Sequence, residues 1–377
     1  MEKAKVALLQ CGNYEEENVY QAIRQGLALL GGLGQFVRPE ENILLKPNLL
    51  KGAAPEKAIT THPAVFSAVL RCLREEGYTH LTYGDSPAAA FDAQKTAVQS
   101  GLTVPAEKYG AEFGDFSGAE PTEYPAGKTA KKFMFAREVV KADAIISLCK
   151  MKTHALENIT GAMKNQYGCI FGPYKAAGHA AYPNAQSFAD MMADMNRCLG
   201  VRLFIMDGIL AMEGNGPSSG DPKLMKVLLL SADPVALDSV FAHLVHLDPH
   251  HVPTCVSGAR EGLGKMEADE ITVLTPEGEL TVDEAAAKYG DPTFAVKRKN
   301  TTFWHLRSLL PTARHYTDRP VPDPDKCIAC GLCQQSCPVE GAAVHSGQGQ
   351  KAVYDYKKRI RCYCCQEVCP VGAISRQ

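Results

Sequence analysis

The sequence has no long apolar run, and no window of its 377 residues approaches eighteen uninterrupted apolar residues. A helix needs roughly that length to cross a bilayer, so we expect no membrane span. The first residues, MEKAKVALLQC, carry too short an apolar run for a signal peptide. We therefore expect a cytoplasmic protein.

A nucleotide-binding fingerprint is also missing. The glycine-rich stretches GGLG, EGLG and EGNG match neither the dinucleotide pattern nor the triphosphate loop, so nicotinamide or ATP use is not supported. No sign of charge dominates either, since the net charge is −2, and we expect no nucleic-acid partner. With 45% hydrophobic residues, the chain can build one large or two ordinary domains.

Cysteine, by contrast, is abundant, and eight of the 14 cysteines follow Asp325. The run CIACGLCQQSCP has the C-x2-C-x2-C-x3-C-P spacing of bacterial iron–sulfur proteins, in which three thiolates hold one cluster and the fourth crosses to another. A second run, RIRCYCCQEVCP, makes an internal repeat, because Cys369 follows Cys337 by 32 residues.

The repeat predicts two [4Fe–4S] clusters. The predicted ligands of the first cluster are Cys327, Cys330, Cys333 and Cys369. Those of the second include Cys337, Cys362 and Cys365. Structural disulfides are the weaker reading because they belong to oxidising compartments, and a zinc site usually pairs only two C-x2-C knuckles.

The second run departs from the pattern at one position. Its fourth thiolate should stand at residue 359, which is Arg359. Cys364, an additional cysteine between two predicted ligands, is a candidate replacement; otherwise one iron has a non-thiolate ligand or is missing. The basic run Lys357, Lys358, Arg359 and Arg361 is either a solvated face or a docking site for an acidic redox partner.

Before the cysteines, buried strands alternate with amphipathic helices. This alternation predicts an α/β fold with a mostly parallel sheet covered by helices on both faces. We expect an α/β domain over 1–290, a linker over 291–324 and a small cluster domain over 325–377. The linker's apolar residues, Phe303, Trp304, Leu306, Leu309 and Leu310, favour docking between domains over a membrane surface.

Ionisable and amide side chains follow several predicted strands. Ligands of open α/β sheets collect at the carboxyl ends of strands, so these residues are candidates for one cleft. The candidate binding residues are Lys46, Asn48, Asp85, Lys150, Lys152 and His154. The candidates for catalysis are Lys150, Lys152, His154, Asp207 and Glu213. The clustered cations predict a small anionic ligand, and a buried ion-pair network is the competing interpretation.

The motifs LLKPNLL, GDSP, KMKTH with GAMKNQYG, DGILAMEGNGP and ADPVALD resemble those of the family called domain of unknown function 362, often fused to a C-terminal two-cluster ferredoxin. The resemblance covers residues 1 to about 285 and the cysteine-rich end. It implies an α/β domain joined to a small α+β ferredoxin domain and to electron transfer, without naming a substrate. It also implies a cysteine where Arg359 stands.

Two functions follow as hypotheses. In the first, the protein is an iron–sulfur electron-transfer protein or oxidoreductase that passes electrons between a redox partner protein and the ligand at the strand ends. In the second, it is a non-catalytic binding or maturation module with structural clusters. Reducibility of the clusters separates the two.

Overall fold

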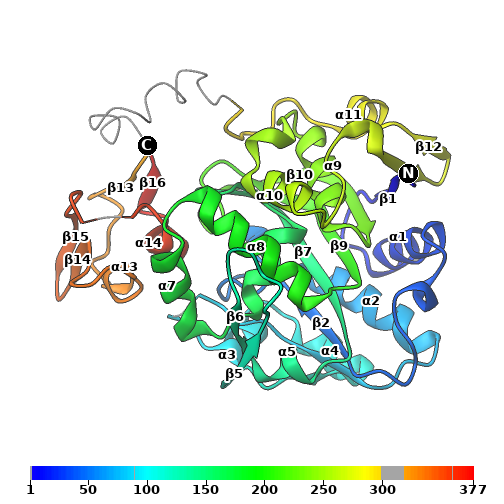
Figure 1. The fold of residues 1–377 in the computed structure, drawn as a ribbon, viewed down its shortest axis with the longest axis horizontal. Coiled ribbons are helices and arrows are strands. Elements are labelled where there is room, and N and C mark those ends of the chain that lie inside the picture. The colour runs from blue at the N-terminus through cyan, green and yellow to red at the C-terminus, as the bar shows by residue number, and fades with distance from the viewer. Residues whose placement is uncertain (1, 89, 299–317, 359) are drawn as a thin grey trace.

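The computed structural model describes residues 2–88, 90–298, 318–358 and 360–377. Most of the chain forms an α/β unit, and the residues after 318 form a smaller unit at one end of it (Figure 1). The predicted docking segment around Trp304 and the substitution at Arg359 both lie outside the described residues.

Ten strands form one mixed sheet in the order β12-β11-β1-β10-β9-β7-β2-β3-β4, with β8 paired to β7. The strands are β1 (Ala4–Gln10), β2 (Ile43–Pro47), β3 (Leu81–Tyr83), β4 (Glu112–Phe113), β7 (Ala144–His154), β8 (Asn158–Thr160), β9 (Leu203–Glu213), β10 (Asp221–Ser231), β11 (Ile271–Thr275) and β12 (Gly278–Leu280). The central run from β9 through β7, β2 and β3 to β4 is parallel. The predicted α/β fold with a mostly parallel sheet is therefore confirmed, but β10 runs antiparallel to both β1 and β9.

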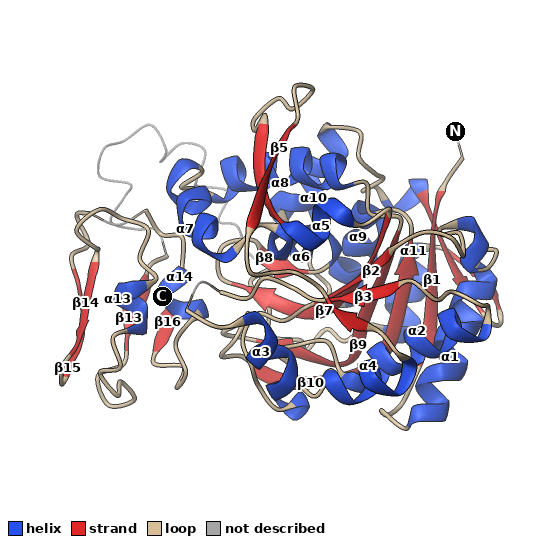
Figure 2. Ribbon diagram, turned by 90° about the horizontal axis from the view of Figure 1, so that it is seen from below, coloured by secondary structure: helices blue, strands red, loops and turns tan. Residues whose placement is uncertain are grey.

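Helices cover both faces of the sheet (Figure 2). One face carries α1 (Glu16–Leu29), α2 (Pro63–Glu75) and α4 (Thr103–Tyr109). The other carries α6 (Ala162–Asn165), α8 (Ala185–Leu199), α9 (Pro234–Leu244) and α10 (Pro253–Arg260). Asp233 caps α9: its Oδ1 accepts hydrogen bonds from the backbone N–H groups of Val235 and Ala236, both 2.9 Å.

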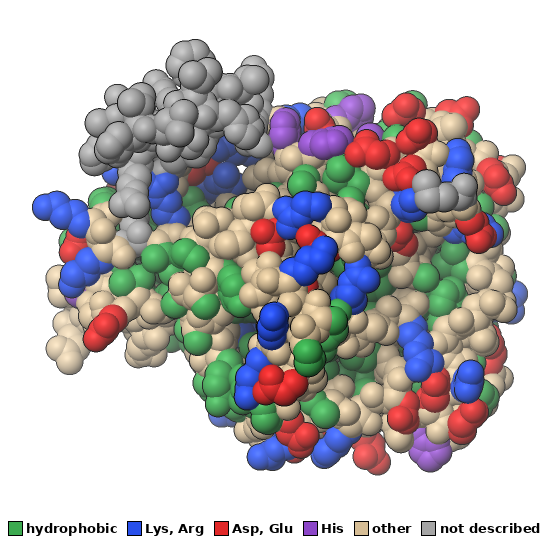
Figure 3. Space-filling view, in the orientation of Figure 1, with side chains coloured by type: hydrophobic (Ala, Val, Ile, Leu, Met, Phe, Trp, Pro, Cys, Tyr) green, Lys and Arg blue, Asp and Glu red, His purple; other side chains and the backbone are tan. Residues whose placement is uncertain are grey.

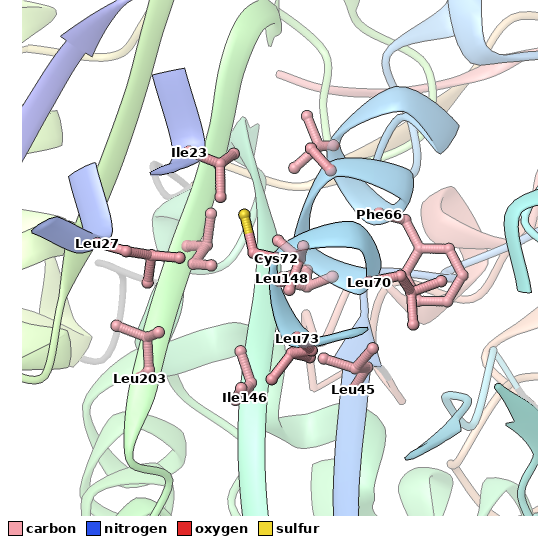
Figure 4. Close-up of a cluster of buried hydrophobic side chains, with 14 of the residues drawn as sticks. Ile23, Leu27, Leu45, Phe66, Leu70, Cys72, Leu73, Ile146, Leu148 and Leu203 are labelled. Atoms are coloured by element: carbon pink, nitrogen blue, oxygen red, sulfur yellow. The ribbon is translucent and has the colours of Figure 1, made fainter. Parts of the chain in front are cut away.

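The strands bury alternate residues in two cores, as the two-residue period of a strand requires. In β1, Ala7 and Leu9 pack with α1 and α2, whereas Val6 and Leu8 pack with α9. Figure 4 shows Leu148 and Leu203 of the first core opposite Leu70 and other side chains of α1 and α2. The methionines of α8 are buried in a third cluster, where they pack as core residues.

The small unit repeats a short supersecondary pattern. Gly331, with φ 80°, precedes α13 (Leu332–Gln335), and Tyr363, with φ 63°, precedes α14 (Cys364–Glu367). The two helices are therefore offset by the same 32 residues as the cysteine runs. Its strands are β13 (Pro320–Pro322), β14 (Val344–Gly347), β15 (Gln350–Tyr354) and β16 (Ile374–Arg376).

The predicted linker contains residues that pack on both units. Phe294 is fully buried in the core of the α/β unit, and β13 pairs antiparallel with β16 in the small unit. The boundaries 1–290, 291–324 and 325–377 remain predictions.

Candidate functional site: a cysteine cavity and an adjoining cation pocket

Four cysteines of the small unit line one small cavity. They are Cys327, Cys330, Cys333 and Cys369, the set that the crossed repeat assigns to the first cluster. Three come from the loop before α13 and its first turn, and the fourth comes from the other half of the repeat. Apolar side chains, including Ile328, Val371 and Ile374, complete the wall. Four thiols around a closed, mostly apolar space fit an iron–sulfur cluster.

Backbone N–H groups point at several of the cysteine sulfurs. Ala352 donates to Cys327 Sγ at 3.4 Å, and Ala373 donates to Cys369 Sγ at 3.2 Å. Ala343 donates to Cys337 Sγ at 3.3 Å, in the predicted second set. Such hydrogen bonds stabilise a thiolate and tune any cluster it holds. In the described residues, no three His, Cys, Asp or Glu side chains converge closely enough to hold one metal ion.

The structural repeat also places the second set. Cys362 and Cys365 correspond to Cys330 and Cys333, and Cys364 corresponds to Leu332, the first residue of α13. Cys364 is buried and lines a different space, the pocket between the two units. Its thiol lies beside Cys362 and lowers the pKa of that thiol through a hydrogen bond.

Contacts between the two units run through α14 and the loop after it. The Gln366 side chain donates to Asn215 Oδ1 at 2.6 Å, and His154 Nε2 lies 3.1 Å from Glu367 Oε1. Lys51, which follows β2, donates to the Cys369 carbonyl oxygen at 3.0 Å. The end of the sheet that carries β7 and β9 therefore docks directly onto the cysteine loops.

A pocket rich in lysine lies at this junction; we call it the cation pocket. Its polar lining from the α/β unit is Asn48, Asp85, Ser86, Lys152, His154, Thr160, Lys164, Asn165, Tyr167, Lys175 and His179. The small unit contributes Ser336, Cys364, Glu367 and Val368. The chain thus puts basic side chains and the flank of the predicted second cluster on opposite walls of one space.

Burial weakens the charge of several groups in the cation pocket. It is the main cause that lowers the pKa of Lys152 to about 7, helped by the charge of Lys164, and that of Lys175 to about 8. The pKa of His154 falls to about 4 and that of His179 to about 3, again mainly through burial. Both imidazoles are therefore neutral at pH 7, and His179 Nδ1 has no hydrogen-bond partner in the described part of the chain.

Glu367 is the acid that faces these groups. Burial raises its pKa, but the hydrogen bond to His154 and the charge of Lys164 outweigh burial and leave the pKa below its usual range. A neutral His154 imidazole that donates to the Glu367 carboxylate accounts for the lowered pKa of both groups, because an ion pair would have raised the pKa of His154. The contact is thus a hydrogen bond between a neutral donor and an anion.

Of the predicted binding residues, Asn48, Asp85, Lys152 and His154 line the pocket. Lys46 lies behind it, in a buried ion pair with Asp85 at 2.9 Å. Gly168 covers that pair: a Cβ there would lie 1.8 Å from Asp85 Oδ1 and 2.6 Å from Lys46 Nζ. Only a glycine therefore fits above the pair.

Lys150 and Asp207 form a second buried ion pair, 2.7 Å long, away from the pocket lining. The Tyr14 hydroxyl donates to Asp207 Oδ1 at 2.8 Å and accepts from Lys150 at 3.0 Å. Glu213 accepts from the backbone of Ala295 at 2.7 Å. Three of the predicted catalytic candidates thus lie outside the pocket. Lys150 and Asp207 pair with each other, and Glu213 accepts a hydrogen bond from the backbone.

Sequence reasoning missed Lys164, Lys175, Tyr167 and His179. All four belong to the glycine- and tyrosine-rich segment 161–179, whose composition favours a loop. The segment covers the cleft, and it does so as α6, η3 (Gln166–Cys169) and α7 (Gly172–Ala181). Its two lysines, Lys164 and Lys175, were the available signal.

A sequence profile of the domain of unknown function 362 matches residues 43–243, and a profile of the 4Fe-4S dicluster domain matches residues 319–370. The chain belongs to the domain of unknown function 362 family. This family member is 35% identical over 280 residues to a thylakoid-associated protein of Synechocystis sp., an alignment that covers 74% of this chain and 86% of that protein.

Two solved structures also align with this family member. The lactate racemase apoprotein from Thermoanaerobacterium thermosaccharolyticum gives a TM-score of 0.38 at 11% identity, over 61% of this chain. A Thermotoga maritima protein gives 0.34 at 13% identity, over 58%. This chain spans 54% and 56% of their lengths, respectively. No helix in the described ranges has the length and apolar character to cross a membrane.

Proposed function

We propose that this protein transfers electrons between a redox partner protein and a small anionic ligand, a substrate or cofactor, held in the cation pocket. One observation carries the proposal: the pocket that holds Lys152, Lys164 and Lys175 is closed on its other side by Cys364 and Glu367. Both residues are neighbours of the cysteines assigned to the second cluster. A bound ligand would therefore lie against a redox centre.

In this proposal two [4Fe–4S] clusters exchange single electrons, which is their usual chemistry. Cys327, Cys330, Cys333 and Cys369 hold the first. Cys337, Cys362 and Cys365 hold the second, and no thiolate is assigned to its fourth iron. The backbone donors of Ala343, Ala352 and Ala373 stabilise the thiolates, and the apolar walls exclude water.

The anionic character of the ligand follows from the charges around the pocket. Four ammonium groups, those of Lys46, Lys152, Lys164 and Lys175, stand near two carboxylates, Asp85 and Glu367. Because the two imidazoles are neutral, two positive charges are left over when Lys152 and Lys175 are both protonated. A dianion such as a phosphate ester or a dicarboxylate matches this excess, and partial burial strengthens the attraction relative to bulk water.

The partner is proposed to dock at the free end of the small unit. Cys330 is exposed there, and Figure 3 shows several Lys and Arg side chains among apolar and acidic ones on the part of the small unit that it presents. An acidic protein surface would complement this charge and steer association. A cytoplasmic location belongs to the same proposal, because all fourteen cysteines are unpaired.

The test has a redox arm and a binding arm. In an anaerobic dithionite titration followed by electron paramagnetic resonance, the clusters should reduce within an accessible range. Clusters that never reduce would overturn electron transfer and leave the binding-module function. In calorimetry with sulfate or succinate as probe, Lys152→Ala should weaken binding at least tenfold, about 1.4 kcal/mol, while the exposed control Lys288→Ala should not. If Lys152→Ala lowers only the melting temperature, the lysine belongs to an ion-pair network and the pocket proposal fails.

A further inference from the structure

Lys51 belongs to the α/β unit but ends in the cysteine region. It lies in the segment after β2, and its Nζ donates to the carbonyl oxygen of Cys369 at 3.0 Å. The residue is 8% exposed. Cys369 is also held at its sulfur by the Ala373 N–H, so the α/β unit and the small unit contact the same cysteine at different atoms.

Among the residues that the structure describes, no carboxylate is paired with this ammonium group. Within the described ranges, no Asp or Glu oxygen lies in ion-pair distance of Lys51, although Lys46 and Lys150 nearby on the same sheet each have an acid at less than 3 Å. A buried cation without a counter-ion is costly, because a single carbonyl oxygen does not replace the lost hydration. Burial accordingly lowers the pKa of Lys51, and negative charge beside Cys369 would stabilise its protonated form.

A thiolate-ligated [4Fe–4S] cluster supplies that charge, because it is anionic and gains one further negative charge on reduction. Net charge and nearby hydrogen bonds are among the factors that set the reduction potential of such a cluster. A fixed cation next to a ligand cysteine stabilises the reduced state more than the oxidised state.

We propose that Lys51 is a positioning residue of the α/β domain that raises the reduction potential of the cluster assigned to Cys327, Cys330, Cys333 and Cys369. The inference rests on the cluster assignment of the proposed function and is independent of the pocket ligand. It makes the potential depend on the docking of the two units. By reciprocity, reduction of this cluster tightens the contact between them.

The experiment is an anaerobic redox titration of the full chain, monitored by electron paramagnetic resonance, on the parent protein and on Lys51→Met. Lys51→Met keeps the length of the side chain and removes the charge. We expect one of the two cluster signals to shift to a lower midpoint potential and the other to stay in place. The control is Lys57→Met, which removes an exposed lysine from the same segment and should shift neither signal.

Iron content, measured on the same samples, separates the possible failures. If the parent protein holds no clusters, the proposed function itself fails. If iron is unchanged in Lys51→Met and both midpoints stay in place, or both shift equally, only the role of Lys51 is overturned. If Lys51→Met loses iron, Lys51→Gln and Lys51→Arg are compared instead. Lys51→Gln should lower the midpoint potential and Lys51→Arg should not. Equal midpoint potentials in these two variants refute the inference.

Discussion

His154 Nε2 lies 3.1 Å from Glu367 Oε1, and this contact joins the last residue of β7 to the helix between two predicted cluster ligands. Both side chains are buried. The donor is neutral and the acceptor is charged, which is the pairing that gives a strong hydrogen bond at modest desolvation cost. The contact therefore couples the sheet to the cysteine loops.

This coupling is measurable with a double-mutant cycle. His154→Ala and Glu367→Ala, alone and together, should show an interaction free energy of about 1.5–3 kcal/mol in anaerobic urea unfolding. The matched control is the exposed pair His250 and Asp248, whose atoms lie 2.9 Å apart; its interaction energy should stay below about 1 kcal/mol. Equal values for the two pairs would contradict the inference that the buried contact joins the units.

Iron analysis after anaerobic reconstitution should give about seven or eight irons per chain, eight for two complete clusters and seven if one corner lacks a thiolate. Cys333→Ser should remove the first cluster only. Cys198→Ser, outside both cysteine runs, is the control and should leave the iron count unchanged. A parent protein with about four irons or fewer would show that the second run does not ligate as proposed.

Cys364→Ser tests the cysteine that lines the cation pocket. In the repeat it stands where Leu332 stands in the first half, so we expect its loss to leave the iron count unchanged and to weaken sulfate binding. Cys365→Ser, at the position equivalent to Cys333, should lose iron. If Cys364→Ser loses one iron instead, Cys364 is the fourth ligand that the second run otherwise lacks.

Anion binding should weaken as the pH rises. Lys152 and Lys175 have pKa values lowered to about 7 and about 8, so each loses its charge in the free pocket between about pH 6 and 9. Sulfate stays a dianion over this range, and its affinity should fall as the lysines deprotonate. In Lys152→Met, binding is weaker and the fall starts at higher pH. A flat profile in the parent protein would mean that neither lysine contacts the anion.

Glu157 should make the stability of the folded state fall as the pH rises from about 4.5 to about 8. It is fully buried without a hydrogen-bond partner for its side chain in the described residues, and burial raises its pKa from 4.5 to about 8. The folded state therefore keeps a proton that the unfolded state releases. The resulting stability is complete below about pH 4.5 and is lost as the pH rises through 8, at up to about 1.4 kcal/mol per unit. Glu157→Gln should remove this slope from the thermal denaturation profile between pH 6 and 9, and exposed Glu279→Gln should not.

The sequence predicted the positions of the strands and helices better than the order and direction of the strands in the sheet. Apolar periodicity located the strands and helices, and the cysteine spacing predicted a set of four that the structure brings to one cavity. The antiparallel insertion of β10 was not predictable, because a strand buried on both faces has the same apolar run in either direction.

The candidate site shows the same limit. The sequence shows which strands end in charged residues. It does not show which strands are neighbours in the sheet, and therefore which of these residues lie in contact. Lys46 and Lys150 meet Asp85 and Asp207, which a strand order would have predicted. Lys164 and Lys175 escaped notice because they lie on short helices in a glycine-rich segment, whose composition favours a loop.

Gly168 links the substitutions that two parts of the chain can accept, the covering segment and the sheet. Any side chain at this position would collide with the Asp85 carboxylate, and its positioned carbonyl accepts from the Ser86 N–H at 3.0 Å. A lineage that replaced Gly168 would first have to give up the ion pair beneath it, and with it the charge balance of the cation pocket. Substitutions in the covering segment and substitutions in the sheet are therefore not independent. Homologues that keep Lys46 and Asp85 should also keep a glycine at the position of Gly168.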